Sequence, residues 1–338
     1  IDVHAGELEI SMALDRVNGT LKEIVGKDCG MAIRLGVMVG LLFSVAAMAE
    51  FTFEDRDGSL TLLENGKPVY SYRYEMVAPP QGVPAHFSRS CYIHPLYDLN
   101  GNVITQDFPI DHFHHRGVFW AWPECKAGER PMDVWALGNV RQRHEEWLAR
   151  ETGTDRAVMA VRNRWAFDAD PEKAVVREEV RITAFPSGET GRPLDFDIRL
   201  TNVSGDSVTF LGAKNKGYGG FCFRPDAKNK PFVFTTAKGV CPEDALQFDT
   251  PWADVSWAKE GGAGVAIFEH PSNPGYPFPG WIFRHYAFLG ASWPHEQEHV
   301  LKPGESFQLR YRLYIHAGDA EKGEVERSFR DYTATVER

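Results

Sequence analysis

The stretch LDFDIRLTN, residues 194–202, alternates apolar and polar side chains over its whole length. A period of two places the apolar side chains on one face of a β-strand and the polar ones on the other. The residues SGD at 204–206 are typical of a turn, and the alternating segment VTF comes next at 208–210. The stretch therefore predicts two strands joined by a turn, each with one face directed to a core.

The same alternation recurs through most of the chain. The segments end at Gly, Pro, Asn or Asp, and turn signals stand at Asp57-Gly58 and Asn65-Gly66. The further alternating segments are residues 51–76, 157–170, 174–188 and 305–318. Only residues 319–334 indicate a helix, and that helix is short. Many strands with frequent turns and no internal repeat predict an all-β fold, a large antiparallel β-sandwich with few short helices.

The N-terminal part differs from the rest of the chain. Residues 1–30 share no pattern with the later segments, and we expect them to be upstream translated sequence outside the fold. Residues 31–49 combine a basic start, an apolar run from Leu35 and a small-residue cleavage signal at Ala47-Met48-Ala49. The run is shorter than the roughly 20 residues of a membrane-spanning helix, so it predicts a secretory signal peptide. The expected mature chain is one β-sandwich domain, residues 50–338, in the periplasm or secreted.

Charge and cysteine content narrow the class of protein. The net charge is −10 and no basic stripe is present, so nucleic acid is not an expected partner. No apolar segment after residue 49 is long enough to span a membrane. Four cysteines come after the predicted cleavage site: Cys91, Cys125, Cys222 and Cys241. In an exported protein these form disulfides or stay as buried thiols, and their spacing does not decide between the two.

Three stretches between the strands combine charged, aromatic, glycine and proline residues. They are residues 89–122, 214–226 and 268–292. Loops of this composition are where binding and catalytic residues are usually found. The first stretch contains DHFHHRG at 111–117, which holds three of the 12 histidines of the chain. This histidine block is the strongest candidate for a functional centre.

The motifs in these stretches resemble the PmoA family of exported bacterial proteins, whose label is "methane oxygenase". The resemblance rests on YIHPLY (92–97), TQDFPIDHFHHRG (105–117), GYGGF with the nearby Arg224, and EHPSNP with PGWIFRHY (269–286). It implies a sandwich like that of galactose mutarotase, a supersandwich, and a partnership with enzymes of sugar catabolism. A methane-oxidising membrane subunit would need transmembrane helices that this chain lacks, so we do not take an activity from the label.

The histidine block indicates acid–base chemistry. A neutral imidazole accepts or donates a proton near pH 7, and a carboxylate beside it fixes its tautomer. In a strand, His112 and His114 would point to one face, and Phe113 and His115 to the other. The candidate catalytic residues are His94, His112, His114, Asp107 and Asp111.

A second set of residues is expected to bind the substrate. Arginine holds a carboxylate or stabilises developing negative charge, and the flat face of tryptophan packs on a sugar ring. The candidates are Arg89, His115, Arg116, Trp135, Arg224, His270, Asn273, Trp281 and Arg284. Together the two sets predict an enzyme that acts on a sugar or sugar acid, free or in an oligosaccharide. The expected reaction is an epimerisation, an elimination or a hydrolysis.

Several alternatives stay open. His112 and His114 would be the ligands of a divalent metal in a metal-dependent oxygenase, although the glutamate of cupin-type sites is missing after them. No nucleotide-binding motif is found, and no cofactor is expected. The chain would otherwise be a non-catalytic carbohydrate-binding protein, or the histidine block would only hold a loop. A glycosidase with two carboxylates, such as Glu269 and Glu296, is a further alternative.

Overall fold

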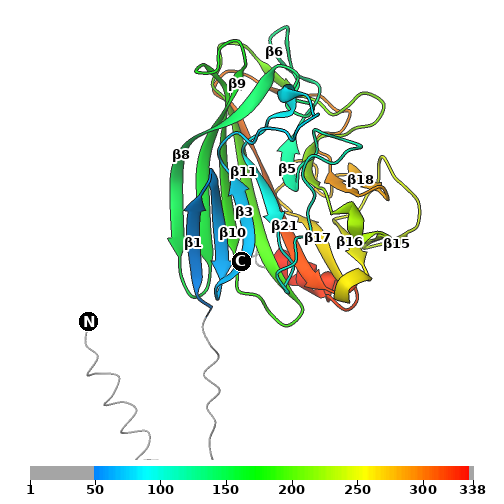
Figure 1. The fold of residues 1–338 in the computed structure, drawn as a ribbon. Helices are drawn as coiled ribbons and strands as arrows, with labels where there is room; N and C mark the ends of the chain where they lie inside the picture. The colour runs from blue at the N-terminus through cyan, green and yellow to red at the C-terminus, as the bar shows by residue number, and fades with distance from the viewer. Residues whose placement is uncertain (1–48, 335–338) are drawn as a thin grey trace, which may run out of the picture. The chain divides into compact units, whose positions relative to one another are not determined.

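The computed structural model describes residues 49–334, apart from the side chain of residue 260. The expected upstream segment 1–30 and nearly all of the expected signal peptide lie outside the described residues. The described chain is built from antiparallel strands arranged in three sheets (Figure 1). This confirms the predicted all-β fold of large antiparallel sheets. No helix among the described residues is long and apolar enough to cross a membrane.

The first sheet has eight strands and is connected to the three loop-rich stretches that the sequence analysis singled out. In spatial order it contains β1 (Phe51–Arg56), β2 (Ser59–Glu64), β3 (Lys67–Arg73), β4 (Tyr92–Leu96), β5 (Val118–Ala121), β13 (Gly220–Phe223), β19 (Phe288–Ala291) and β18 (Trp281–Arg284).

The second sheet has nine strands and includes the longest ones. In spatial order it contains β15 (Gly239–Cys241), β14 (Val233–Thr236), β16 (Trp252–Trp257), β17 (Ala263–Glu269), β21 (Ser306–Ala317), β11 (Gly191–Asn202), β10 (Ala174–Ala184), β9 (Ala157–Phe167) and β8 (Val140–Thr152). The stretch 194–202 lies in β11, where its apolar side chains are buried and its two aspartates are partly exposed, as the alternation predicts.

The remaining elements are short. A four-stranded sheet contains β20 (His299–Leu301), β12 (Val208–Phe210), β6 (Cys125–Ala127) and β7 (Arg130–Met132). The α-helix is α2 (Val325–Ala334), inside the predicted segment 319–334, and its Val325 and Tyr332 are buried. Single 3-10 turns are η1 (Ala85–Phe87), η2 (Ala227–Asn229) and η3 (Lys259–Gly261).

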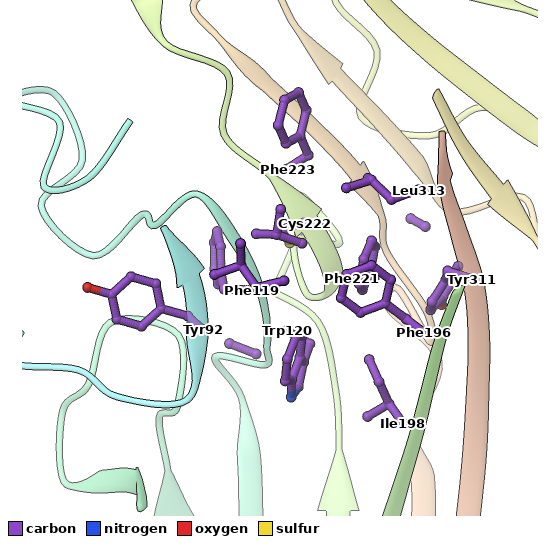
Figure 2. Close-up of a cluster of buried hydrophobic side chains, with 14 of the residues drawn as sticks. Tyr92, Phe119, Trp120, Phe196, Ile198, Phe221, Cys222, Phe223, Tyr311 and Leu313 are labelled. Atoms are coloured by element: carbon purple, nitrogen blue, oxygen red, sulfur yellow. The ribbon is translucent and has the colours of Figure 1, made fainter. Parts of the chain in front are cut away.

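Buried aromatic side chains pack the two large sheets against each other. Phe221 of β13 stacks on Tyr311 of β21 at a ring-centroid distance of 4.8 Å and meets Phe196 of β11 edge-on at 5.0 Å. On the eight-stranded side its ring is parallel to that of Trp120 at 6.4 Å. Figure 2 shows these side chains between the strands of the two sheets. Burial of aromatic surface of this size is the main source of stability at such an interface.

The cysteines form no disulfide in the described structure. Cys91, Cys125 and Cys222 are buried, and Cys241 is partly exposed. Burial raises the pKa of the three buried thiols. The sequence left open whether these cysteines form disulfides or stay as buried thiols. Three of the four described cysteines are buried thiols.

Replacing Phe221 with alanine tests the role of this aromatic contact. We expect Phe221→Ala to lower the free energy of unfolding by about 3–5 kcal/mol, because it removes a fully buried ring between two sheets and leaves a cavity. Val300→Ala, at a side chain that is 47% exposed, is the matched control and should change stability by about 0.5 kcal/mol or less. Chemical denaturation followed by tryptophan fluorescence measures both, and equal effects would contradict the assignment.

Candidate functional site

The histidine block lies where several strand ends of the eight-stranded sheet meet. It immediately precedes β5, whose Val118 pairs with Phe223 at the end of β13. Phe223 also pairs with Leu289 of β19, and Phe288 pairs with Arg284 at the end of β18. Because neighbouring strands run antiparallel, the start of β5, the end of β13 and the β18–β19 turn share one end of the sheet. Segments far apart in the sequence are thereby brought together.

The histidine block is a pair of turns, so the prediction that His112 and His114 share one face of a strand is wrong. Phe108 has a left-handed backbone (φ 46°) and is followed by Pro109, which ends any extended segment. The backbone N–H of His112 donates to Pro109 O, and that of His115 donates to His112 O, each at 2.9 Å. As a result the rings of His112 and His115 stack at 4.6 Å, and the ring of His114 stands edge-on to both.

An arginine–aspartate–histidine chain orders these turns. Arg224, directly after β13, donates from Nη2 to both carboxylate oxygens of Asp111 at 2.7 and 2.9 Å. Oδ2 of Asp111 lies 3.1 Å from Nδ1 of His112. Arg224 is 1% exposed, whereas the Asp111 side chain is 40% exposed. Partial burial raises the pKa of Asp111, but the hydrogen bonds from Arg224 and His112 outweigh it and hold that pKa below its ordinary value. Asp111 is therefore a carboxylate that faces Nδ1 of His112.

The side chains around the block form a closed circuit of contacts. Tyr286 stacks on His112 at 4.9 Å, and the guanidinium of Arg284 lies 5.3 Å from the Tyr286 ring. Nη1 of Arg284 donates to the hydroxyl of Tyr218 at 2.8 Å. The ring of Tyr218 lies 5.9 Å from that of Trp135, Trp135 lies 5.8 Å from His114, and His114 lies 5.7 Å from His112. We call these six residues the ring circuit: Arg284, Tyr218, Trp135, His114, His112 and Tyr286.

Two buried rings form the floor of the ring circuit. His115 contacts His112, His114 and Trp135, and it lies 5.2 Å from Phe288, which also contacts Tyr218 and Trp135. His115 and Phe288 are 1% and 0% exposed, whereas all members of the circuit except Trp135 are partly exposed. The circuit is therefore a partly exposed group of side chains that rests on two buried aromatic rings.

His114 is the free imidazole of the circuit. Neither of its ring nitrogens makes a hydrogen bond to the described residues. Burial, and then the positive charge of Arg89, lower the pKa of His114 to about 3. Burial lowers the pKa of His115 well below its ordinary value, and Nδ1 of His115 lies 3.3 Å from Nη1 of Arg224. Both imidazoles are neutral at physiological pH, so His114 can donate one hydrogen bond and accept another.

Arg89 places an unpaired positive charge behind the circuit. Its guanidinium is 1% exposed and donates from Nη2 to the carbonyls of Val134 and Trp135. Nε and Nη1 are buried without a hydrogen-bond partner, and no carboxylate of the described residues forms an ion pair with it. Burial, and then the nearby Arg116, lower the pKa of Arg89 to about 9, which still leaves it charged at neutral pH. A buried charge without a counterion is costly, and it gives this end of the sheet a surplus of positive charge.

Arg116 and Asp107, two further predicted site residues, hold the backbone of the block. Arg116 is fully buried and donates to the carbonyls of Phe113 and His115 at 2.7 Å and to that of Phe87 in η1. Its Nε lies 3.2 Å from Asp107, which also accepts from the hydroxyl of Tyr92. These donors are used within the protein, so Arg116 acts as a clamp of the turns.

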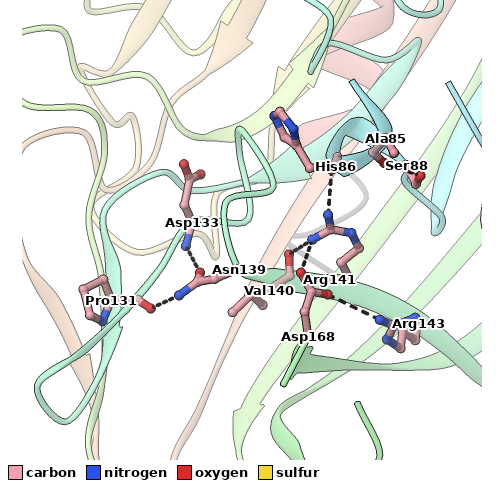
Figure 3. Close-up of polar contacts among 10 residues, drawn as sticks. All are labelled: Ala85, His86, Ser88, Pro131, Asp133, Asn139, Val140, Arg141, Arg143 and Asp168. Atoms are coloured by element: carbon pink, nitrogen blue, oxygen red, sulfur yellow. Dashed lines mark hydrogen bonds and ion pairs between the residues drawn. The ribbon is translucent and has the colours of Figure 1, made fainter. Parts of the chain in front are cut away.

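A second clamp fixes the flanking loops to the nine-stranded sheet. Arg141 of β8 donates to His86 O of η1 at 2.6 Å and to Asp168 at 2.7 Å (Figure 3). In the loop that carries Trp135, Asn139 accepts from Asp133 N–H and donates to Pro131 O. Arg141 thus ties η1 to the nine-stranded sheet, and Asn139 closes the loop that carries Trp135.

The remaining four predicted residues make their contacts elsewhere in the fold. His94 contacts Thr105 at 3.0 Å, and His270 contacts Ser272 at 2.7 Å. Asn273 is buried and hydrogen-bonds with the backbone of Arg310, and Trp281 is a core residue that donates to Thr250 O. The structure shows no contact between these four and the three histidines of the block.

The carboxylates of the glycosidase alternative also lie outside the circuit. Glu269 is buried, accepts from Phe278 N–H at 2.9 Å, and has a pKa raised by burial to about 8. Glu296 is exposed and accepts from Asn215 N–H. In the described part of the chain, no three His, Cys, Asp or Glu side chains are placed to hold one metal ion.

Three residues at the candidate site were not predicted from the sequence: Tyr218, Tyr286 and Asp244. Asp244 accepts from Nε of Arg284 at 2.9 Å and from the backbone N–H of His285 at 2.7 Å. Both tyrosines stand inside the motifs GYGGF and RHY, beside arginines that were predicted. Their position in these motifs was the available signal.

The fold and the ring circuit define an all-β protein with an aromatic, arginine-rich surface site. The model of a family described as "Family of unknown function (DUF6807)" matches residues 59–330, and the chain belongs to this family. No curated protein matches the chain. Nothing in these comparisons refers to the PmoA label or to methane oxidation, so that label stays a prediction.

Solved structures of similar fold are carbohydrate-related. They include a putative aldose 1-epimerase from Escherichia coli K12, with 10% identity over 80% of this chain and 99% of that chain and a TM-score of 0.33. An aldose epimerase homologue from C. elegans has 8% identity over 80% of this chain and 100% of that one, with a TM-score of 0.33. An alpha-galactosidase from Geobacillus stearothermophilus has 12% identity and a TM-score of 0.41, and 80% of this chain spans 40% of that chain. These likenesses concern the arrangement of strands and carry no inference about activity.

The neutral state of His114 gives a testable pH dependence. Its pKa is lowered in the folded protein, so below about pH 6.5 the unfolded chain binds a proton that the folded chain does not. The free energy of unfolding should fall by about 1.4 kcal/mol per pH unit from this group as the pH drops from 6.5 towards 4. In His114→Asn, the free energy of unfolding should decrease less steeply as the pH drops, and the difference in slope should be about 1.4 kcal/mol per pH unit. Denaturation at several pH values measures it, and identical slopes for the two proteins would contradict a neutral His114.

Proposed function

We propose that this protein is a carbohydrate-active enzyme that uses His112 as its proton-transferring base. The carrying observation is the chain of contacts from Arg224 through Asp111 to Nδ1 of His112. In this arrangement a carboxylate orients an imidazole and stabilises the imidazolium that forms when the ring takes a proton. The substrate would be a sugar or sugar acid, free or in an oligosaccharide, and the reaction an epimerisation, an elimination or a hydrolysis.

The proposed proton acceptor is a single atom, Nε2 of His112. Asp111 faces Nδ1 of His112, which leaves Nε2 without a hydrogen bond to the described residues. Asp111 itself is held by two hydrogen bonds from a buried arginine, so the carboxylate keeps its place when the imidazole becomes charged. Stacking of His112 between Tyr286 and His115 fixes the plane of the ring. A base that is oriented in advance lowers the cost of reaching the reactive geometry.

His114 would supply the complementary hydrogen bond. A neutral imidazole polarises a substrate oxygen as a donor without becoming an acid, and surrounding positive charge keeps it in that form. The positive charges of Arg89 and Arg224 lie near this ring and are among the causes of its low pKa. Negative charge that develops on the substrate would be stabilised by these groups. The rings of Trp135 and Tyr286 would pack on the apolar face of the sugar.

The proposal includes the location of the protein. Residues 31–49 are proposed to act as a signal peptide that directs the protein to the periplasm or the medium. The resemblance to the PmoA family is proposed to reflect a family that works beside sugar-catabolic enzymes. A divalent metal at His112 and His114 is the alternative to this proposal.

Proton transfer to sugars gives a direct test of His112. The purified chain is incubated in D2O with monosaccharides, sugar acids and oligosaccharides, and proton NMR monitors exchange of carbon-bound hydrogen, new double bonds and new anomeric signals. We expect His112→Gln and Asp111→Asn to lower the rate by about 10²–10⁴-fold, the usual contribution of a positioned base.

The control and the contrary outcomes are defined by the same experiment. His270→Gln changes a histidine outside the ring circuit and should keep the wild-type rate. Saturable sugar binding with no chemical change would indicate a binding protein. A rate that is unaffected by His112→Gln, with the fold intact, would exclude His112 as the base.

A further inference from the structure

The charges at the ring circuit do not balance. Arg116, Arg224 and Arg284 each have an aspartate within ion-pair distance, namely Asp107, Asp111 and Asp244. Arg89 has none among the described residues: Asp133 acts on it electrostatically without forming an ion pair, and two of its guanidinium nitrogens have no hydrogen-bond partner. This surplus occurs in a chain whose overall charge is −10. A positive site on an acidic protein is a local feature that favours an anionic ligand.

The circuit also has hydrogen-bonding atoms that have no partner among the described residues. Arg284 is 27% exposed at its side chain, and its Nη2 makes no hydrogen bond to the described residues, while Nε and Nη1 are held by Asp244 and Tyr218. His114 uses neither ring nitrogen, and His112 does not use Nε2. An arginine fixed through two of its nitrogens presents the third in a defined direction, which suits a carboxylate oxygen.

We infer that the ring circuit takes a sugar that carries a carboxylate, that is a uronic acid or a glycoside of one, with the carboxylate at Arg284 and the surplus charge of Arg89 behind it. This inference rests on the proposed function and names its substrate class. Neutral sugars would fill the aromatic surface but would leave the surplus positive charge without a partner.

A carboxylate also explains why a base is placed here. The hydrogen on the carbon next to a carboxylate is more acidic than other sugar C–H bonds once the carboxylate is bound by positive charge. The proton would pass from that carbon to Nε2 of His112, and the electron pair would be delocalised onto the carboxylate. Return of a proton to the other face gives the epimer. Alternatively, the electron pair forms a C=C bond as the neighbouring C–O bond breaks, and the proton leaves with that oxygen. Neither course needs an oxidant or a further reactant.

Matched pairs of sugars test the inference. The probes are methyl glucuronide and methyl galacturonide against methyl glucoside and methyl galactoside, because each pair differs only in the carboxylate. Calorimetry should show that the full chain binds at least one uronide roughly tenfold or more tightly than its neutral partner, the range of a charge-assisted hydrogen bond. Added salt should reduce the preference, because screening weakens the attraction between charges.

Two arginine variants locate the preference. Arg284→Gln should bring uronide and neutral sugar to similar affinity, whereas Arg310→Gln should keep the wild-type preference. Arg310 pairs with Asp197 and lies outside the ring circuit. Thermal unfolding checks that each variant is folded, and Arg284→Lys, which keeps the charge, should retain part of the preference.

The outcomes separate this inference from the proposed function. Equal affinity for the members of each pair would overturn the inference, and so would binding of neither member. The proposed function is judged by turnover that depends on His112, whatever the charge of the sugar. Turnover of neutral sugars alone would therefore overturn the inferred uronic acid substrate, while His112 would remain the proposed base. Deuterium incorporation at the carbon beside the carboxylate, if it is abolished in His112→Gln, would support both the inference and the proposed function.

Discussion

The ion pair between Arg224 and Asp111 is the interaction on which the candidate site depends. It joins a buried guanidinium at the end of β13 to a carboxylate in an exposed turn that is more than one hundred residues earlier in the chain. A buried arginine that lost this partner would be left uncompensated, which is strongly unfavourable. The turn is therefore held in one position, and with it the imidazole of His112. The stack of Tyr286, His112 and His115 depends on the same contact.

The loops of the site are positioned by the sheets beneath them. Arg116 binds three backbone carbonyls across the histidine block and η1, and Arg141 ties η1 to the long strands β8 and β9. Arg224 directly follows β13, an interior strand of the eight-stranded sheet. Loops alone would move too much to align a base with its substrate, whereas loops fixed at several backbone positions keep the geometry that catalysis needs. Three arginines supply these contacts because one guanidinium can bind several carbonyl or carboxylate oxygens in a plane.

The fold was largely predictable from the sequence, and the site only in part. The alternation in residues 194–202 and its counterparts predicts strands because it reports the local side-chain period, and residues 319–334 contain α2. The histidine block, Arg224, Arg284 and Trp135 were selected for the unusual composition of their stretches, and the structure places them close together, while their function stays a prediction. The pairing of the histidines was predicted wrongly, since Phe108 and Pro109 turn the chain where a strand was expected.

The remaining differences arise from long-range contacts. His94, His270, Asn273 and Trp281 stand in the same motifs as residues of the ring circuit, but no local pattern tells which side chains the strand order brings together. In the same way, the sequence does not show that Arg116 is consumed by backbone carbonyls while Arg284 keeps a free nitrogen. Tyr218 and Tyr286 stand in motifs that were singled out but were not selected as site residues, because the sequence does not show which aromatic side chains of a β-protein lie outside its core.

The burial of the described cysteines has a consequence for their chemistry. Cys91, Cys125 and Cys222 lie inside the packed sheets, and their pKa values are raised by burial. A thiol of this kind is a poor nucleophile, because the thiolate is the reactive form. Among the described cysteines, the partly exposed Cys241 is therefore the one that an alkylating or oxidising reagent should modify first.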